Sequence, residues 1–366
     1  METKVKILYY LESGNIKKAE KLCRKLLLEN PNDVETLSIL GDIFFGNDDY
    51  PNALEIYTVL NKKVKNDIKF MGKLAICHGK LKKYTNAIKL YEDILKSDEV
   101  NIRVLMNLID ACVHNKDDSK INKYCNILRD IDPCNPLLAS IDSLISFDRN
   151  KENKSVFIDN PINFIKEFSL KDFTNDMDSL IMNLITFSRL VTKEGNIEKK
   201  STLNGWQTLP ILFEQKNSSV DSLKKIIKEC VKEYLKKYLH SNLLYIKRWP
   251  INYDLQGWTV FLSNQGMQKS HNHLSGWMSG VIYLQIPEGK NNNKEGSIEF
   301  SLHGYNYPTK RTDFPKKQII PQKGSIVFFP SSLYHKTLPF TSTEERISIA
   351  FDLVLDKGNK RIGLDL

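Results

Sequence analysis

Three histidines in the second half of the chain have the residue type and the spacing of a metal site. His271 and His273 are separated by one residue, and His335 follows a run of apolar residues. In an extended chain, side chains at positions i and i+2 point to the same face, so His271 and His273 can reach one point in space. Imidazole nitrogen is a good ligand for iron, zinc and copper. We therefore expect these three residues to be the candidate ligands of one metal ion.

An arginine and a serine after the third histidine could bind a carboxylate. Arg346 and Ser348 would share one face of a predicted strand over 346–355. A guanidinium offers a two-pronged donor to a carboxylate, and a nearby hydroxyl adds a third donor. A non-haem Fe(II) site has three protein ligands on one face and leaves positions open for other ligands. Three histidines would suit zinc equally well, but the Arg–Ser pair favours a bound dicarboxylate and hence iron.

The segments that must position these side chains read as short strands. From residue 243 onward, runs rich in Val, Ile, Phe and Tyr alternate with turns marked by Gly, Pro or Asn, which is typical of a sandwich or barrel. The predicted strands are 243–249, 258–263, 278–286, 297–302, 325–330 and 346–355. Helical spacing of apolar residues predicts helices over 180–191 and 220–239.

The region from about residue 201 to the C-terminus resembles the 2-oxoglutarate/Fe(II)-dependent dioxygenase superfamily. Besides the three histidines, the matching residues are Gly205-Trp206-Gln207-Thr208, Ser279-Gly280, Tyr283-Leu284, Pro287, Gly296, Gly324, Phe329-Pro330-Ser331, Glu345-Arg346, Ser348 and Phe351. The resemblance implies a double-stranded β-helix (jelly roll) with flanking helices. It also implies Fe(II), 2-oxoglutarate as co-substrate and O2, with ascorbate as a reductant.

Carried over residue by residue, the resemblance assigns roles to five side chains. His271 would be the first iron ligand and His335 the distal one. Arg346 would pair with the C5 carboxylate of 2-oxoglutarate, helped by Ser348. Tyr283, on a neighbouring strand, would donate a hydrogen bond to the same carboxylate.

Position 273 departs from the superfamily, because most members have Asp or Glu there. A neutral His ligand leaves an Fe(II) site with one negative charge fewer. Three interpretations are open: His273 is a true third ligand, it lies behind a water that fills the position, or it replaces His271 as the first ligand. The aspartyl β-hydroxylases, which also join helical repeats to an oxygenase domain, work without this carboxylate, so its loss does not exclude activity.

The first half of the chain is repetitive. Segments 15–19, 49–53 and 83–87 align at a spacing of 34 residues and end in Ala19, Ala53 and Ala87. Each alanine is followed four residues later by a medium-sized or large side chain. The pattern resembles the tetratricopeptide repeat, in which small residues let paired helices approach closely. A fourth, degenerate unit fits 102–135, with Ile121 in the alanine position.

These patterns divide the chain into three parts. Residues 1–150 are predicted to form tetratricopeptide-like helical repeats, 151–200 a connecting segment with a helix, and 201–366 the oxygenase-like β-domain. The boundary near 150 is placed where a polar segment, 149–160, loses the 34-residue register. The polar stretch 289–296 is a candidate lid for the site.

Composition narrows the classes of function. The net charge is +9, and most of the excess lies after residue 150, on lysines that are typical of a solvated helix face, so we do not expect nucleic-acid binding. No apolar run reaches the ~18–20 residues of a membrane span, and nothing marks export. With six cysteines and no C-x-x-C pair, we expect a reducing cytoplasm. The cysteines of the first half are expected to be core residues.

The sequence thus favours an enzyme that hydroxylates a protein or peptide side chain recruited by the repeat groove, with release of succinate and CO2. Two alternatives stay open. The chain could be a non-catalytic binding or scaffold protein with a degenerate oxygenase domain. It could also be a small-molecule tailoring oxygenase whose repeats serve a homo-oligomer.

Overall fold

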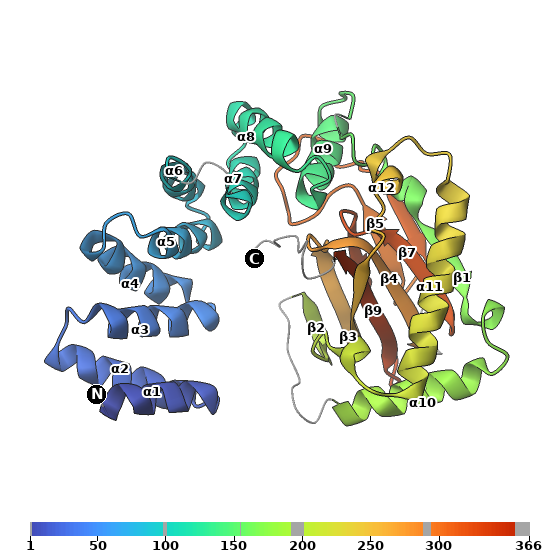
Figure 1. The fold of residues 1–366 in the computed structure, drawn as a ribbon, viewed down its shortest axis with the longest axis horizontal. Helices are drawn as coiled ribbons and strands as arrows, with labels where there is room; N and C mark the ends of the chain where they lie inside the picture. The colour runs from blue at the N-terminus through green and yellow to red at the C-terminus, as the bar shows by residue number, and fades with distance from the viewer. Residues whose placement is uncertain (1, 98–100, 154, 192–200, 288–293, 356–366) are drawn as a thin grey trace. The chain divides into compact units, whose positions relative to one another are not determined.

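The computed structural model describes residues 2–97, 101–153, 155–191, 201–287 and 294–355 (Figure 1). The chain divides into two compact units. The first runs to Ile131 and the second begins at Asp132.

The first unit consists of helices arranged in successive antiparallel pairs (Figure 1). The helices among its described residues are α1 (Glu2–Glu12), α2 (Ile16–Glu29), α3 (Val34–Gly46), α4 (Tyr50–Lys63), α5 (Ile68–Lys80), α6 (Tyr84–Leu95), α7 (Ile102–His114) and α8 (Asp118–Ile131). The second helix of each pair begins at residue 16, 50, 84 or 118, so the predicted spacing of 34 residues is confirmed as a structural period.

Capping and turn residues repeat with the same period. The side chain of Asp67 accepts a hydrogen bond from the Phe70 backbone N–H, and Asn101 accepts one from that of Val104, each at 3.0 Å. Such caps satisfy backbone donors that the first helical turn leaves unpaired. Between the helices of a pair, Asp48, Lys82 and Lys116 all adopt a positive φ, near +60°.

Small residues sit where the paired helices approach, as the repeat pattern predicts. Ala19, Ala53 and Ala87 are completely buried. A Cβ atom added to Gly41 would lie 3.1 Å from side-chain atoms of both Ile56 and Tyr57. The cysteines of this half are buried and free, which confirms their prediction as core residues.

Helix α9 (Pro136–Asp148) continues the 34-residue spacing but packs in the second unit. Ala139 belongs to the core of that unit, and the Asp148 carboxylate accepts hydrogen bonds from the backbone N–H groups of Lys310 and Arg311 at 2.6 and 2.9 Å. The sequence places the boundary near 150, where the register ends. The contacts divide the chain earlier, because Ala139 of the last helix in register packs in the core of the second unit.

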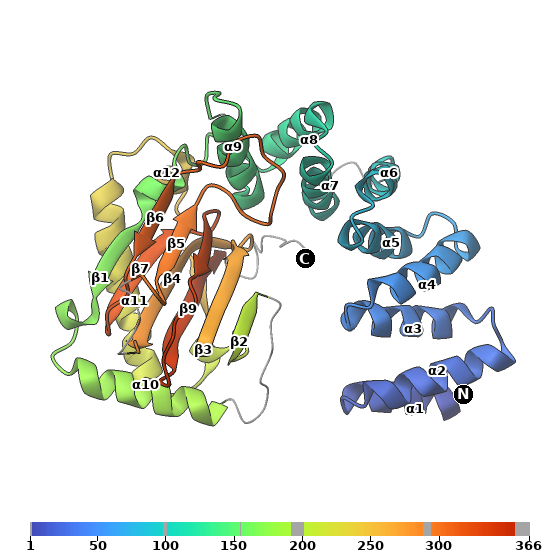
Figure 2. The same cartoon turned by 180° about the vertical axis from the view of Figure 1, so that it is seen from behind.

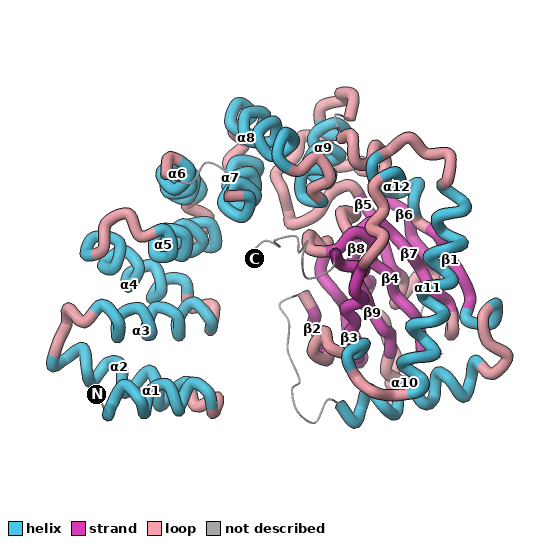
Figure 3. Tube along the Cα trace, viewed as in Figure 1, coloured by secondary structure: helices cyan, strands magenta, loops and turns pink. Residues whose placement is uncertain are grey.

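The second unit is built on a curled antiparallel sheet (Figures 2 and 3). Its strands are β1 (Lys166–Ser169), β2 (Thr202–Gln207), β3 (Tyr253–His271), β4 (Gly276–Gln285), β5 (Ile298–Ser301), β6 (Lys316–Ile319), β7 (Ser325–Pro330), β8 (Tyr334–Thr337) and β9 (Arg346–Leu355). The order is β1-β7-β4-β9-β3-β8-β5-β6, and β2 pairs with β3. This arrangement is consistent with the predicted double-stranded β-helix.

Strand β3 turns the corner of the half-barrel. Its first part pairs with β9 as far as Leu262, whereas Gln268 and His271 pair with β8. Between Leu262 and Gln268, Gln265 adopts a φ of +60°. The register with β8 shifts further along, between Gln268 and His271, as at a β-bulge. The bend brings the end of β3 opposite β8, where His271 pairs with His335.

Helices cover the outer face of the sheet (Figure 3). They are α10 (Met177–Val191), α11 (Ser218–Tyr238) and α12 (Leu244–Lys247), with the short 3-10 helices η1 (Pro161–Phe164), η2 (Leu170–Asp172) and η4 (Leu212–Glu214). The two long helices confirm the predictions for 180–191 and 220–239. No helix in the described ranges is both long and apolar enough to cross a membrane.

The strand predicted over 243–249 is wrong, because this segment contains α12. Tyr245 and Trp249 are four residues apart, and their rings contact at 5.6 Å between centroids. In a strand, residues four apart lie about 13 Å from each other along the chain, so their rings meet only where the backbone forms a helical turn. The aromatic side chains that suggested a strand therefore belong to a buried cluster, in which Tyr245 also packs on Tyr234.

Gly280 of β4 offers a test of the packing beneath the site. A Cβ added there would lie 2.3 Å from the ring of the buried Phe351. Gly280→Ala should destabilise the second unit by about 1–3 kcal/mol through overpacking. Because all four tryptophans lie after residue 200, the midpoint of the tryptophan-fluorescence unfolding transition reports on this unit.

The matched control is Gly72→Ala in α5, where an added Cβ meets nothing within 4 Å. It should stabilise its helix by about 1 kcal/mol and leave the tryptophan transition in place. An unchanged midpoint for Gly280→Ala would contradict the packing described for β4 and β9.

Candidate metal centre

The structure brings the three predicted histidines together at the mouth of the half-barrel. One nitrogen from each of His271, His273 and His335 lies within 4.8 Å of the others, a grouping that could hold a metal ion. His271 and His335 face each other across the β3–β8 pair, with 4.4 Å between ring centroids. His273 follows the end of β3, and its centroid is 5.2 Å from that of His271 and 5.0 Å from that of His335.

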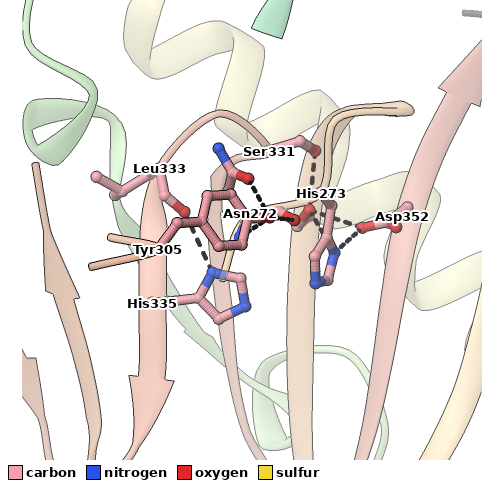
Figure 4. Close-up of polar contacts among 8 residues, drawn as sticks. Asn272, His273, Tyr305, Ser331, Leu333, His335 and Asp352 are labelled. Atoms are coloured by element: carbon pink, nitrogen blue, oxygen red, sulfur yellow. Dashed lines mark hydrogen bonds and ion pairs between the residues drawn. The ribbon is translucent and has the colours of Figure 1, made fainter. Parts of the chain in front are cut away.

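Each ring has its Nδ1 turned toward an acceptor. Nδ1 of His271 lies 2.7 Å from the Lys269 carbonyl oxygen, and Nδ1 of His335 lies 3.2 Å from that of Leu333 (Figure 4). A carbonyl oxygen can only accept, so Nδ1 carries the proton in both rings. The lone pair of a neutral imidazole is then on Nε2, which is the form a metal requires.

Burial favours the neutral form of the most enclosed ring. His335 is only 7% exposed. Its burial, followed by the proximity of His271 and His273, lowers its pKa well below the usual range. The ring is therefore ready to bind a cation at neutral pH without first losing a proton.

His273 differs from the other two in its acceptor. Its Nδ1 lies 2.6 Å from Oδ1 of Asp352 on β9 (Figure 4). The backbone N–H of His273 also donates to the Ser331 carbonyl at 2.9 Å. Ring and backbone are therefore both held, and the structure places His273 within the same cluster as His271 and His335.

The predicted carboxylate-binding residues lie on the inner face of the sheet. Arg346 is 1% exposed; its Nε donates to the Gly296 carbonyl at 3.1 Å and its Nη1 to Ser348 Oγ at 3.4 Å. Its guanidinium carbon lies 5.0 Å from the centre of the Tyr283 ring. No carboxylate among the described residues pairs with this buried cation. A buried charge without a counter-ion is costly, so the arrangement suits an anion that enters from outside.

Tyr283 adds a second unsatisfied group at the same place. Its side chain is completely buried, and among the described residues its hydroxyl makes no hydrogen bond of ordinary geometry, although it lies beside the Arg346 guanidinium. Burial, offset in part by the Arg346 charge, raises its pKa to about 12, so the hydroxyl stays protonated and can donate. Ser348 is opposite Tyr283 in the β4–β9 register. A carboxylate bound here would satisfy the guanidinium and the hydroxyl together.

Strand β9 links the two groups of side chains through its alternation. Arg346, Ser348, Ala350 and Asp352 share the inner face, and the odd-numbered residues between them face the helices. The Arg346 group and Asp352, the hydrogen-bond partner of His273, therefore lie along one face of one strand.

Sequence reasoning missed two residues that hold the cluster. Asp352 continues the alternation already used for Arg346 and Ser348, so extending the i, i+2 rule along the strand would have found it. Asn272, between two of the histidines, accepts a hydrogen bond from the Tyr305 hydroxyl at 2.8 Å and donates to the Ser332 carbonyl at 3.2 Å. No sequence signal marks Tyr305 as its partner. Most of the candidate lid, 289–293, lies outside the described residues.

Comparison with known families agrees with this geometry. Residues 256–352 match the family model described as "Putative 2OG-Fe(II) oxygenase", and this range contains the three histidines, Tyr283, Arg346, Ser348 and Asp352. Residues 4–153 match the model of the coatomer epsilon subunit. No curated protein matches the chain.

Among solved structures, a prolyl-4-hydroxylase of Pseudomonas putida is 14% identical, with a TM-score of 0.37, and the alignment covers 52% of this chain and 92% of that one. MamA from Desulfovibrio magneticus RS-1 is 17% identical, with a TM-score of 0.38, covering 40% of this chain and 84% of that one. Likenesses this distant do not bear on what the chain binds. The second unit thus contains a domain that matches the 2OG-Fe(II) oxygenase model, and the first is a helical repeat region resembling the coatomer epsilon subunit.

His335→Ala should abolish stoichiometric metal binding, because it removes the most buried of the three nitrogens. The measurement is metal content after anaerobic loading with Fe(II) and desalting. The matched control is His303→Ala. His303 is also partly buried, but its Nε2 lies 2.8 Å from the Tyr307 carbonyl and outside the cluster. Full metal occupancy in His335→Ala would place the metal elsewhere.

Proposed function

We propose that the chain is a 2-oxoglutarate- and Fe(II)-dependent dioxygenase that hydroxylates a side chain of a protein or peptide, releasing succinate and CO2. One observation carries the proposal. Among the described residues, a three-histidine cluster is held to the inner face of β9 through Asp352, and a buried arginine without a carboxylate partner, Arg346, lies on the same face of that strand.

The residues present fit the iron and the co-substrate. His271, His273 and His335 would hold the metal through Nε2, with each Nδ1 anchored to an oxygen. Bound iron would supply the redox chemistry that couples oxidation of 2-oxoglutarate by O2 to hydroxylation of the substrate. The charge and donors that bind the far carboxylate come from Arg346 and Ser348.

The protein's own contribution is binding, orientation and exclusion of water. Arg346 would bind the C5 carboxylate as a two-pronged donor, and the Tyr283 hydroxyl would donate to the same group. Val260, Leu262 and Phe340 form a small buried apolar cluster on the inner face. A dry, low-dielectric interior strengthens the attraction between the guanidinium and a bound carboxylate.

The repeat unit supports a polypeptide as the substrate. Stacked helix pairs of this kind form extended surfaces that commonly bind peptide segments. Binding of a small molecule does not require such a surface. We therefore propose that the repeats recruit the protein whose side chain is oxidised, and this step rests on architecture alone.

The proposal predicts metal-dependent turnover of 2-oxoglutarate. Purified protein given Fe(II), ascorbate and 2-oxoglutarate in air should form succinate, which NMR detects, because such sites decarboxylate the co-substrate slowly even without substrate. His271→Ala should form none. A protein fraction that accelerates succinate formation would support a polypeptide substrate, whereas acceleration by a metabolite fraction alone would contradict it.

Failure to bind any metal would overturn the enzyme proposal and leave the repeat unit as a binding module. If Fe(II) and 2-oxoglutarate both bind but no succinate forms under any added fraction, the domain is not a dioxygenase.

Arg346→Met should weaken 2-oxoglutarate binding strongly while metal stays bound. Truncating one partner of a buried charge pair costs about 2–5 kcal/mol, or ~30-fold or more in the dissociation constant. Methionine retains much of the apolar stem, which limits the loss of packing. Calorimetric titration of the metal-loaded protein with 2-oxoglutarate measures the effect. Tyr283→Phe, which removes one neutral donor, should cause a smaller loss. Unchanged affinity in Arg346→Met would show that the carboxylate binds elsewhere.

A further inference from the structure

We propose that Asp352 is a positioning residue of the metal site. It supplies, through the ring of His273, the negative charge that an acidic ligand supplies directly in most sites of this type. The inference rests on the proposed function, because it needs a metal bound by the three histidines.

The geometry begins with a short, buried hydrogen bond. Nδ1 of His273 lies 2.6 Å from Asp352 Oδ1, and the two side chains are 12% and 7% exposed (Figure 4). A carboxylate in this place accepts the Nδ1 proton and directs Nε2 toward the other two rings. It thereby fixes both the tautomer and the direction in which His273 presents its lone pair.

The carboxylate is itself held in place. Ser279, directly opposite Asp352 in the β4–β9 register, donates its hydroxyl hydrogen bond to Asp352 Oδ1 at 2.6 Å. The Ser279 hydroxyl also contacts that of Ser331 at 2.8 Å. Ser331 in turn accepts the backbone N–H of His273. The network therefore closes on itself and leaves the aspartate little freedom to turn away.

Charge gives the second argument. Among the residues that the structure describes, no lysine or arginine pairs with the Asp352 carboxylate. A buried carboxylate needs a cation or strong donors to offset the loss of its hydration. Here the donors are one neutral hydroxyl and one imidazole, and a metal ion on the far side of that imidazole would provide the missing positive charge.

The third argument is that the three histidines are not equivalent. His271 and His335 direct Nδ1 at neutral backbone carbonyls, whereas His273 directs it at a carboxylate. His273 is also the residue at the position where related sites have the acidic ligand. The carboxylate of Asp352 therefore stands behind the His273 ring instead of contacting the metal directly. Carboxylate–histidine pairing of this kind makes the ring a stronger ligand.

The first test is Asp352→Asn in the full chain. The amide oxygen can still accept the Nδ1 proton, so the change removes charge while keeping the shape. We expect Co(II), used as a spectroscopic probe for Fe(II), to bind about 10–100-fold more weakly. Its visible absorption spectrum should also change, because the ligand field of His273 changes. The matched control is Asp313→Asn, an exposed acid paired with Arg311 in the same unit, which should leave both unchanged.

The second test moves the charge. His273→Asp alone would set a second carboxylate beside Asp352, and the repulsion should weaken Co(II) binding. In the double variant His273→Asp/Asp352→Asn the site has one carboxylate again, now in direct contact with the metal. The double variant should therefore bind Co(II) more tightly than either single variant. Additive losses in this cycle would overturn the proposal.

A measurement on the wild-type protein does not depend on the folding of any Asp352 variant. Its Co(II) form should show three exchangeable, paramagnetically shifted N–H signals in proton NMR, one from each Nδ1. The signal of His273, identified by its disappearance in His273→Asp, should exchange slowest with solvent because of Asp352. Only two such signals would overturn the inference. Wild-type protein that binds no Co(II) or Fe(II) would instead overturn the proposed function, and the two failures are thus distinguishable.

Discussion

The alternation of strand β9 is the constraint on which the functional half of the molecule depends. Ile347, Ile349 and the other odd-numbered residues lie in the core between the sheet and helices α10 and α11. The even-numbered residues are thereby forced to the inner face, where Arg346 and Asp352 lie at the two ends of one row that also contains Ser348 and Ala350. Because the side-chain period of a strand is two, a slip of one residue would turn every polar group into the helices. The packing that stabilises the domain therefore also fixes the register of the site.

This row holds two charges that the described protein residues leave uncompensated. Among the described residues, no carboxylate pairs with the buried Arg346, and no lysine or arginine pairs with the buried Asp352, whose carboxylate accepts from the His273 ring. Isolated buried charges destabilise a fold, whereas ligands that bind only the folded state stabilise it. A metal behind His273 and a dicarboxylate at Arg346 would compensate each charge in turn. The free energy that these buried charges cost the ligand-free protein would be recovered when the metal and the dicarboxylate bind. The same side chains would therefore destabilise the free site and favour binding.

The helical unit obeys a different physical rule. Its capping residues, inter-helix turns and buried alanines recur every 34 residues, because each helix pair can bury its apolar face only against its neighbours. The regularity extends to Asn135, which caps α9 with the same offset as Asn101 caps α7. At that helix the partner changes, since Ala139 packs among residues of the β-domain. A repeat register therefore does not by itself locate a domain boundary.

The sequence alone determined the repeat period, the β-rich second half and the residues that could bind metal and carboxylate, because these are local patterns or pairs two residues apart in the chain. It misjudged 243–249, where aromatic content suits a strand and a buried helical turn equally. Only the tertiary structure decided that β3 bends so that His271 meets His335, and that Asp352 stands behind His273. Those contacts join residues 64 and 79 positions apart in the chain. No local periodicity in the sequence predicts contacts between residues so far apart. They form because the sheet closes and helices pack on its outer face.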